Sequence, residues 1–196
     1  MAEVELPKPD ELHEHRQHAF SRRVALTTAI YAVVLAIASL GANNAVKEML
    51  LAQQQSSDQW AFYQAKVIRE HQYRGQKMLL ELQLAEPSAL KTAERGKVEA
   101  LAKKFADEEQ RYNAEKKDIE KDARKLEKSR DVQREKHPYF EFGEVLLQIA
   151  IVSASVSILS ASRPTFWFSL ALALLGAALT VNGFMQVVKL PVLHHH

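Results

Sequence analysis

Three long stretches of this chain contain no charged side chain, and they constrain its fold more than any other feature. They cover residues 24–46, 145–162 and 164–188, which are 23, 18 and 25 residues long. A helix needs about 20 apolar residues to cross the roughly 30 Å hydrocarbon core of a bilayer. A helix of a soluble protein is rarely apolar on every face over such a length. The sequence therefore predicts an all-α integral membrane protein with three transmembrane helices.

The rest of the chain is divided by these spans. Asp10 is a suitable cap for a short helix that ends near Arg16. The terminal run of histidines, 194–196, is typical of a purification-tag remnant, and we assign it no function. The expected segments are a polar arm at 1–20, transmembrane helices at 21–46, 138–162 and 164–189, an extramembrane segment at 47–137, and a tail at 190–196.

The extramembrane segment at 47–137 predicts a long helical hairpin, coiled-coil-like, inserted between the first and second spans. A break is expected near residues 86–88, where Glu-Pro-Ser interrupts the pattern with a turn signal and a helix cap. Pro138 is expected to end the second helix, because proline lacks the backbone N–H that a helix interior uses. Apolar side chains recur at helical or seven-residue spacing. They are Trp60, Tyr63, Val67, His71, Met78 and Leu82 in the first helix, and Val98, Phe105, Tyr112, Ile119 and Leu126 in the second, where Glu109 and Lys116 leave the companion position polar.

Charge and composition exclude several classes of function. Residues 47–141 hold 20 Lys/Arg and 18 Asp/Glu with interleaved signs, whereas a nucleic-acid binder needs an uncompensated basic face. The chain has no cysteine, which removes thiolate metal sites and thiol nucleophiles. It also lacks a glycine-rich phosphate loop and a serine elbow motif. We therefore expect no enzyme activity, no cofactor and no nucleic-acid partner.

Histidines in the N-terminal arm raise the question of a metal site. Glu11, His15 and His18 would share one face of a helix, and both residue types can bind a metal ion. Such a site also needs a fixed surrounding shell, which an exposed arm does not supply. A solvated arm without a metal is the favoured interpretation.

Small side chains gather on one face of each predicted span. Helices in lipid associate through close backbone approach and hydroxyl hydrogen bonds, because no hydrophobic force drives them together. These faces predict tight packing within or between subunits, and the alternative is that one of them lines a pore. The residues are Ala32, Ala36, Ser39 and Asn43 in the first span, Ala150, Ser153, Ala154 and Ser157 in the second, and Ala173, Gly176, Ala177 and Thr180 in the third.

Two carboxylates lie three residues apart at the start of the second span. In a symmetric assembly Glu141 and Glu144 would form an acidic mouth that attracts cations. The simpler interpretation is that they sit among headgroups or pair with Arg134 or Lys136. The sequence leaves both interpretations open.

The ten residues 57–66, Ser-Asp-Gln-Trp-Ala-Phe-Tyr-Gln-Ala-Lys, resemble the signature of an uncharacterised bacterial membrane protein family, the domain of unknown function DUF4337. The resemblance implies a bacterial envelope protein with one span, a long helical insertion and two further spans. It implies no activity and no catalytic residue. Aromatic rings beside amides also predict a packing point, formed by Asp58, Gln59, Trp60 and Tyr63, in the hairpin or against a partner.

These features predict a homo-oligomeric integral protein of the bacterial inner (cytoplasmic) membrane with a structural or interaction role. Its expected partners are the lipid bilayer, further copies of itself and other envelope proteins. A lone two-helix arm of such length buries too little surface to be rigid, so self-association is expected. The alternative function is an oligomeric ion channel or transporter with a pore lined by the first or second span. Arginines flanking the first span favour a cytoplasmic N-terminus.

Overall fold

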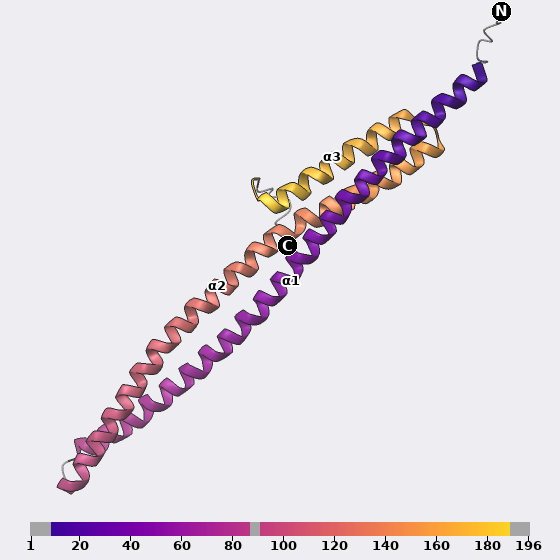
Figure 1. Cartoon of the computed structure of the whole chain (residues 1–196). Helices are drawn as coiled ribbons and strands as arrows, with labels where there is room; N and C mark the ends of the chain where they lie inside the picture. The colour runs from indigo at the N-terminus through magenta and orange to yellow at the C-terminus, as the bar shows by residue number, and fades with distance from the viewer. Residues whose placement is uncertain (1–8, 87–90, 189–196) are drawn as a thin grey trace, which may run out of the picture. The chain divides into compact units, whose positions relative to one another are not determined.

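The computed structural model describes the backbone of residues 9–86 and 91–188, and the side chains of residues 18–86, 91 and 94–188. It consists of the helices α1 (Pro9–Ala85), α2 (Thr92–Leu159) and α3 (Arg163–Met185), with no strand in the described ranges (Figure 1). Each helix is long enough, and contains a stretch apolar enough, to cross a membrane. The all-α prediction is therefore confirmed, with three helices that could span a membrane by length and composition.

Pro138 does not end the second long helix, so that prediction is wrong. It lies inside α2, which continues to Leu159. A proline removes one helical hydrogen bond and crowds the preceding turn, at a cost of about 3 kcal/mol, yet it leaves the bonds on either side intact. Packing of the neighbouring Tyr139 and Phe140, both buried, favours continuation of the helix through this position.

The ends of the other helices also differ from expectation. α1 is unbroken from Pro9, so the prediction of a short helix ending near Arg16 is wrong, and Asp10 lies inside the helix. α1 ends at Ala85 and α2 begins at Thr92, which places the break beside the expected one; Pro87 and Ser88 lie outside the described residues. α3 ends at Met185, short of residue 189, because Gln186 takes a left-handed conformation and its N–H bonds to the Asn182 carbonyl at 2.7 Å.

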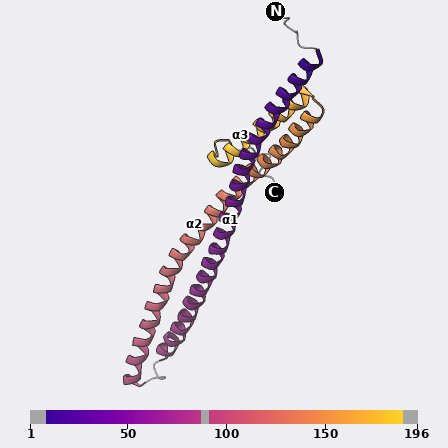
Figure 2. The same cartoon turned by 45° about the vertical axis from the view of Figure 1, so that its right-hand side comes forward.

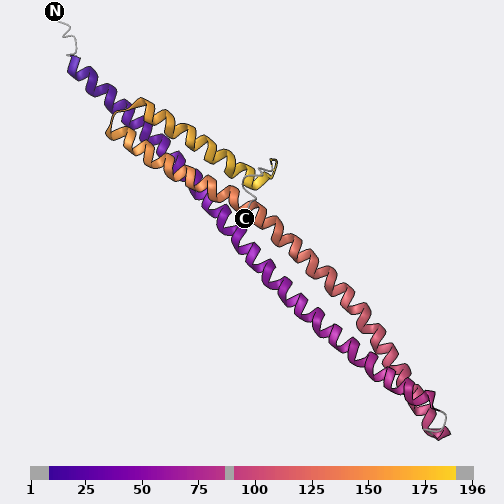
Figure 3. The same ribbon diagram turned by 180° about the vertical axis from the view of Figure 1, so that it is seen from behind.

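Two compact units divide the chain. The three-helix unit comprises Met1–Glu48 and Val132–His196, and the two-helix unit comprises Met49–Asp131. In the three-helix unit α3 lies beside the last part of α2, as Figure 3 shows from behind. Its core contains small and apolar side chains from all three helices: Val24, Tyr31, Ala38, Leu147, Ala150, Ala154 and Ala173.

The two-helix unit is an antiparallel pair formed by α1 and α2 (Figure 2). Arg130 Nη1 donates to Gln53 Oε1 at 2.9 Å near one end, and Arg95 Nη2 donates to the Leu84 carbonyl at 3.2 Å near the other. The contact positions of α2 follow the predicted seven-residue repeat, since none of its five repeat residues is exposed.

The contact face of α1 differs from the predicted stripe. Met78 and Leu82 are 60% and 71% exposed, and His71 is exposed as well. Trp60, Tyr63 and Val67 are half-buried as expected, and the fully buried positions of α1 in this unit are Ala52, Ser56 and Glu70. The prediction was wrong at His71, Met78 and Leu82, because the face that meets α2 includes a charged residue, which an apolar stripe does not reveal.

Candidate functional site

A buried carboxylate lies at the centre of the two-helix unit. Glu70 of α1 is 1% exposed, and its oxygens accept hydrogen bonds from three donors. Asn113 and Lys116 donate from α2, with Asn113 Nδ2 at 3.1 Å, and Arg74 Nη2 donates from the next turn of α1 at 3.0 Å. A buried charge is tolerated only when it is paired and fully hydrogen-bonded. This arrangement fixes the register of α1 against α2.

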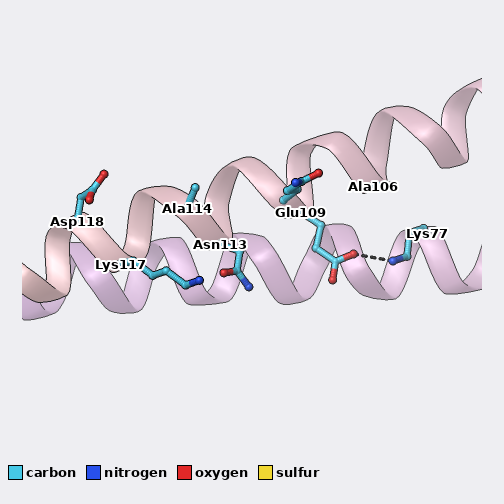
Figure 4. A pocket seen from close by; sticks show the side chains of 8 residues that line it. Lys77, Ala106, Glu109, Asn113, Ala114, Lys117 and Asp118 are labelled. Carbon is cyan, nitrogen blue, oxygen red and sulfur yellow. Dashed lines mark hydrogen bonds and ion pairs between the residues drawn. The ribbon is translucent and has the colours of Figure 1, made fainter.

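The partners of Glu70 extend into a second pair across the helices. Glu109 of α2 accepts from Arg74 Nε and from Lys77 Nζ, both at 2.7 Å. Figure 4 shows Glu109 reaching from α2 to Lys77 on α1. The hollow drawn there is lined by Lys77 and seven residues of α2, with charges of both signs. Lys77 and Glu109 are paired with each other, and the hollow is lined by two cations and two anions, so it offers no excess charge of either sign to a ligand.

The pKa values of these glutamates follow from their partners. Burial raises the pKa of Glu70, but hydrogen bonds from Lys116 and Asn113 and the charges of Lys116 and Arg74 outweigh burial and bring the pKa below its usual value. Hydrogen bonds from Lys77 and Arg74 lower the pKa of Glu109. The Lys66 ammonium likewise lowers the pKa of Glu115. All three carboxylates are therefore held in their charged form.

Tyr112 of α2, at one position of the seven-residue repeat, is surrounded by cations. Its hydroxyl accepts from Arg69 Nη1 at 3.3 Å and from Arg111 Nη2 at 3.1 Å, and these bonds lower its pKa. Its ring stacks on Tyr73 with centroids 5.6 Å apart. Lys66 Nζ lies over the same ring, 5.1 Å from the centroid. Along this unit, the aromatic contact of Tyr112 thus alternates with the charged contacts of Glu70 and Glu109.

The residues of the ten-residue signature contribute to the same helix pair. Trp60 Nε1 donates to Glu127 Oε1 of α2 at 2.9 Å, and the Trp60 ring meets Tyr63 edge to face at 5.4 Å. Arg124 lies 5.8 Å from the Trp60 ring centroid. Asp58 is exposed and Gln59 is half-buried. Trp60 and Tyr63 therefore face α2, whereas Asp58 faces outward.

The small residues of α2 and α3 meet in the three-helix unit. Ala150, Ala154 and Ser157 of α2 are buried, with Ser153 half-buried. In α3, Ala173, Gly176 and Thr180 are buried and Ala177 is half-buried. The Thr180 hydroxyl donates to the Gly176 carbonyl at 2.9 Å, so its polar group is satisfied within its own helix. These faces bring the two backbones close together.

The small residues of α1 do not share that arrangement. Ala32, Ala36 and Asn43 are exposed, and Ser39 is half-buried. Besides Gly41, the buried positions of α1 in this unit are Val24, Tyr31, Ala38 and Ala45, which repeat every seven residues. Within one subunit Ala32, Ala36 and Asn43 therefore point away from α2 and α3, whereas Ser39 contacts α2.

The two carboxylates at the start of the second apolar run have different surroundings. Glu144 is half-buried and its Oε1 accepts from the Ser39 hydroxyl of α1 at 2.7 Å. Glu141 is exposed and lies 3.7 Å from His137 Nδ1, one turn back along α2. Among the described ion pairs, neither carboxylate is joined to Lys136.

Comparison with known protein families identifies the family of this chain. The family model for the domain of unknown function DUF4337 matches residues 20–186, which cover α2, α3 and α1 from residue 20 onward. The chain belongs to the DUF4337 family. Comparisons with the curated proteins and with the solved structures found no significant match.

The sequence did not reveal the contact of the Phe140 ring with two glycines in this DUF4337 protein. We call this contact the aromatic clamp. Phe140 of α2 is 3% exposed and lies between Gly41 of α1 and Gly183 of α3. A Cβ atom on Gly41 would lie 2.6 Å from the ring, and one on Gly183 would lie 2.9 Å from it. Glycine in two apolar helices was the available signal, since glycine is otherwise unfavourable in a helix interior.

No group of three His, Asp or Glu side chains suited to a metal ion occurs among the described side chains of the DUF4337 chain. Glu11 and His15, the candidate metal ligands of the N-terminal arm, lie outside the described side chains. What the described part offers is paired charge, aromatic packing and close helix contacts. These are the properties of a surface that positions helices.

Proposed function

We propose that this protein is a homo-oligomeric integral membrane protein with a structural or interaction role in the bacterial envelope. Its three apolar runs would cross the inner membrane. The α1–α2 pair of the two-helix unit would form a coiled helical hairpin between the first and second spans. Further copies of the chain and other envelope proteins would be its partners.

The observation that carries this proposal is the apolar surface of the two-helix unit. Eight of its large apolar side chains are more than 40% exposed although the unit is otherwise densely charged. Exposed apolar groups of this kind mark interaction surfaces when they are contiguous. Met78, Leu79 and Leu82 fall within two turns of α1 and are 60%, 64% and 71% exposed. A second copy of the chain would cover them.

The α1 helix supplies a second argument for self-association. Its small-residue face at Ala32, Ala36 and Asn43 is exposed within one subunit. Small faces allow close backbone approach in lipid. The corresponding faces of α2 and α3 are already occupied by each other. The face of α1 is therefore available to a neighbouring subunit.

Measuring the mass of the detergent-purified full chain tests the proposal. We expect a single defined multimer at micromolar concentration, and a monomer would contradict it. Replacing Met78, Leu79 and Leu82 by glutamine should reduce the subunit number. The matched control replaces the exposed lysines Lys97, Lys103 and Lys104 of α2 by glutamine, and it should leave the multimer unchanged. Equal loss in both variants would contradict apolar association.

Orientation can be measured cleanly because the chain has no cysteine. The proposal places the N-terminus in the cytoplasm and the two-helix unit outside. A single cysteine at exposed Gln54 should then react with a membrane-impermeant maleimide in intact spheroplasts, and one at exposed Ala19 should not. The reverse pattern would invert the topology.

Ion conduction is a second candidate, favoured by the contact between Glu144 and Ser39. A carboxylate that contacts a hydroxyl at the edge of the apolar runs is energetically expensive and is often functional. In an oligomer, Glu144 and the exposed Glu141 would form an acidic mouth to a pore lined by the first or second span. Cation flux into liposomes that Glu144→Gln abolishes would support conduction. Liposomes that show no cation flux with the wild-type chain would contradict conduction, and the structural role would remain the proposed function.

A further inference from the structure

A hollow of about 350 Å³ opens in the three-helix unit where the apolar parts of all three helices end. α1 contributes Asn44 and Glu48, at the point where its charge-free run stops at residue 46. α2 contributes Gln133 and Lys136, ahead of the run that begins at residue 145. α3 contributes the end of its own run, at Gly183 and Phe184. If these runs cross a bilayer, the hollow lies at the level of the lipid headgroups.

The wall of the hollow facing the helix core is apolar and closely packed. Phe140 lies between Gly41 and Gly183, and its ring meets Phe184 edge to face with centroids 4.7 Å apart. A side chain larger than hydrogen at either glycine would displace the ring. The clamp therefore gives the hollow a rigid floor, which is what a preformed binding site requires.

The rim of the hollow carries one cation and one anion. Lys136 is half-buried and Glu48 is exposed, and neither side chain takes part in an ion pair or hydrogen bond among the described residues. This contrasts with the two-helix unit, where Glu70, Glu109 and Glu115 all have cationic partners. The amides of Asn44 and Gln133 add hydrogen-bond donors and acceptors between the two charges.

This set of groups matches a ligand that carries both charges. An anion alone would meet the Glu48 carboxylate, and a cation alone would meet the Lys136 ammonium. We propose that the hollow binds a zwitterionic phosphate–ammonium group, as in the headgroup of phosphatidylethanolamine. Lys136 would hold the phosphate by a charge-assisted hydrogen bond, and Glu48 would accept hydrogen bonds from the primary ammonium. A trimethylammonium group has no N–H to donate to Glu48, so choline lipids should bind less well.

The proposal rests on the membrane insertion of the proposed function, and native mass spectrometry of the detergent-purified full chain separates the two. The spectrum reports the subunit number and the retained lipids together. Titration with phosphatidylethanolamine, phosphatidylcholine and phosphatidylglycerol of equal chain length should give about tenfold tighter retention of phosphatidylethanolamine. A defined multimer that retains the three lipids equally would overturn the lipid site alone. A monomer that still selects phosphatidylethanolamine would overturn only the self-association.

Substitutions at the two rim charges should both weaken retention of phosphatidylethanolamine but should differ in their effect on phosphatidylglycerol. Lys136→Gln should weaken retention of phosphatidylethanolamine and phosphatidylglycerol alike, because both lose their phosphate partner. Glu48→Gln should weaken phosphatidylethanolamine and strengthen phosphatidylglycerol, because the repulsion of its phosphate is removed. Lys47→Gln and Glu141→Gln are matched controls, since neither side chain lines the hollow, and both should retain wild-type selectivity. Wild-type retention of phosphatidylethanolamine in both rim variants would overturn the proposal.

Soluble competitors identify the source of the headgroup. Phosphoethanolamine that displaces the bound lipid would show that the free zwitterion is sufficient. Failure of phosphoethanolamine to compete, with lipid selectivity intact, would show that the site takes the headgroup only as part of a lipid. Displacement by inorganic phosphate as effective as that by phosphoethanolamine would overturn the proposal, since the site would then be a simple anion site.

Discussion

Gly143 of α2 and Gly176 of α3 face each other with no room for a side chain. A Cβ atom on Gly176 would lie 2.9 Å from the Gly143 carbonyl oxygen, and one on Gly143 would lie 2.8 Å from the Thr180 hydroxyl. Contacts of that length are essentially never seen for real Cβ atoms, and the opposing atoms include backbone, which cannot rotate away. The two helices therefore meet backbone to backbone at this crossing.

Gly176→Ala should destabilise the three-helix unit by about 1–3 kcal/mol, the usual cost of overpacking. Thermal unfolding in detergent, followed by circular dichroism, measures it. The control is Gly75→Ala in the two-helix unit, where a Cβ would meet nothing within 4 Å. That change should stabilise the protein by about 0.5–1 kcal/mol, because alanine is the better helix former. The same sign for both substitutions would contradict the close approach.

Removing one partner of the buried Glu70 should be costly. Lys116→Met leaves the carboxylate, which is 1% exposed, with only Arg74 and Asn113. Breaking a buried ion pair costs about 3–5 kcal/mol. We expect a loss near the lower figure, because Arg74 remains, and unfolding in denaturant measures it.

Replacing both members of that pair should recover the stability. The double variant Glu70→Met, Lys116→Met buries apolar groups of similar volume, and such replacements are often neutral or stabilising by about 1–4 kcal/mol. Lys117→Met is the control, because Lys117 is exposed and should change stability little. A double variant less stable than Lys116→Met would show that the network contributes more than pairing.

The lowered pKa values of three glutamates in the two-helix unit predict that the protein loses stability in acid. Glu70, Glu109 and Glu115 have pKa values below the usual glutamate value. A lowered folded-state pKa gives stability that is fully present above the unfolded pKa, about 4.3, and is lost as the pH falls through the folded pKa. The melting temperature should therefore be flat between pH 6 and 7, by this linkage, and fall below about pH 4. A melting temperature that rises on acidification would contradict the pairing.

Ala161, in the turn between α2 and α3, has a φ of 48°, which side-chain-bearing residues rarely adopt. The Ser162 N–H bonds to the Ser157 carbonyl at 3.1 Å and the Ala161 N–H to that of Ile158 at 3.3 Å. This is the Schellman arrangement, whose left-handed position favours glycine. Ala161→Gly should raise stability by up to about 1 kcal/mol by relieving the strain. A lower melting temperature would show that the turn does not need this conformation.

The hydropathy of the sequence was sufficient to predict three membrane-capable helices, since it depends only on the residues within each run. The repeat of Val98, Phe105 and Tyr112 was likewise local, and all three are sheltered on α2. Polar Glu109 and Lys116 at the companion positions were visible in the sequence. Their partners Lys77 and Glu70 were not, because the apolar stripe expected on α1 passed through Met78 and Leu82 instead.

The continuation of α2 through Pro138 could not be read from local preference, because the packing of Tyr139 and Phe140 outweighs the proline. Packing also decides the direction in which the small residues of the first span face. The sequence therefore allowed these residues to be recognised, but it did not show which neighbour they contact. Ala32 and Ala36 are exposed, whereas Ala38, which did not belong to the predicted face, is buried.

By itself the sequence determined the helical class, the apolar runs and the spacing of the repeat, because each follows from side chains near one another in the chain. Only the tertiary structure decided that Phe140 is clamped by Gly41 and Gly183, and that Glu70 meets Lys116. Those pairings depend on how each helix is rotated and shifted against its neighbour. Rotation and register are set by the sum of many contacts between residues distant in the chain.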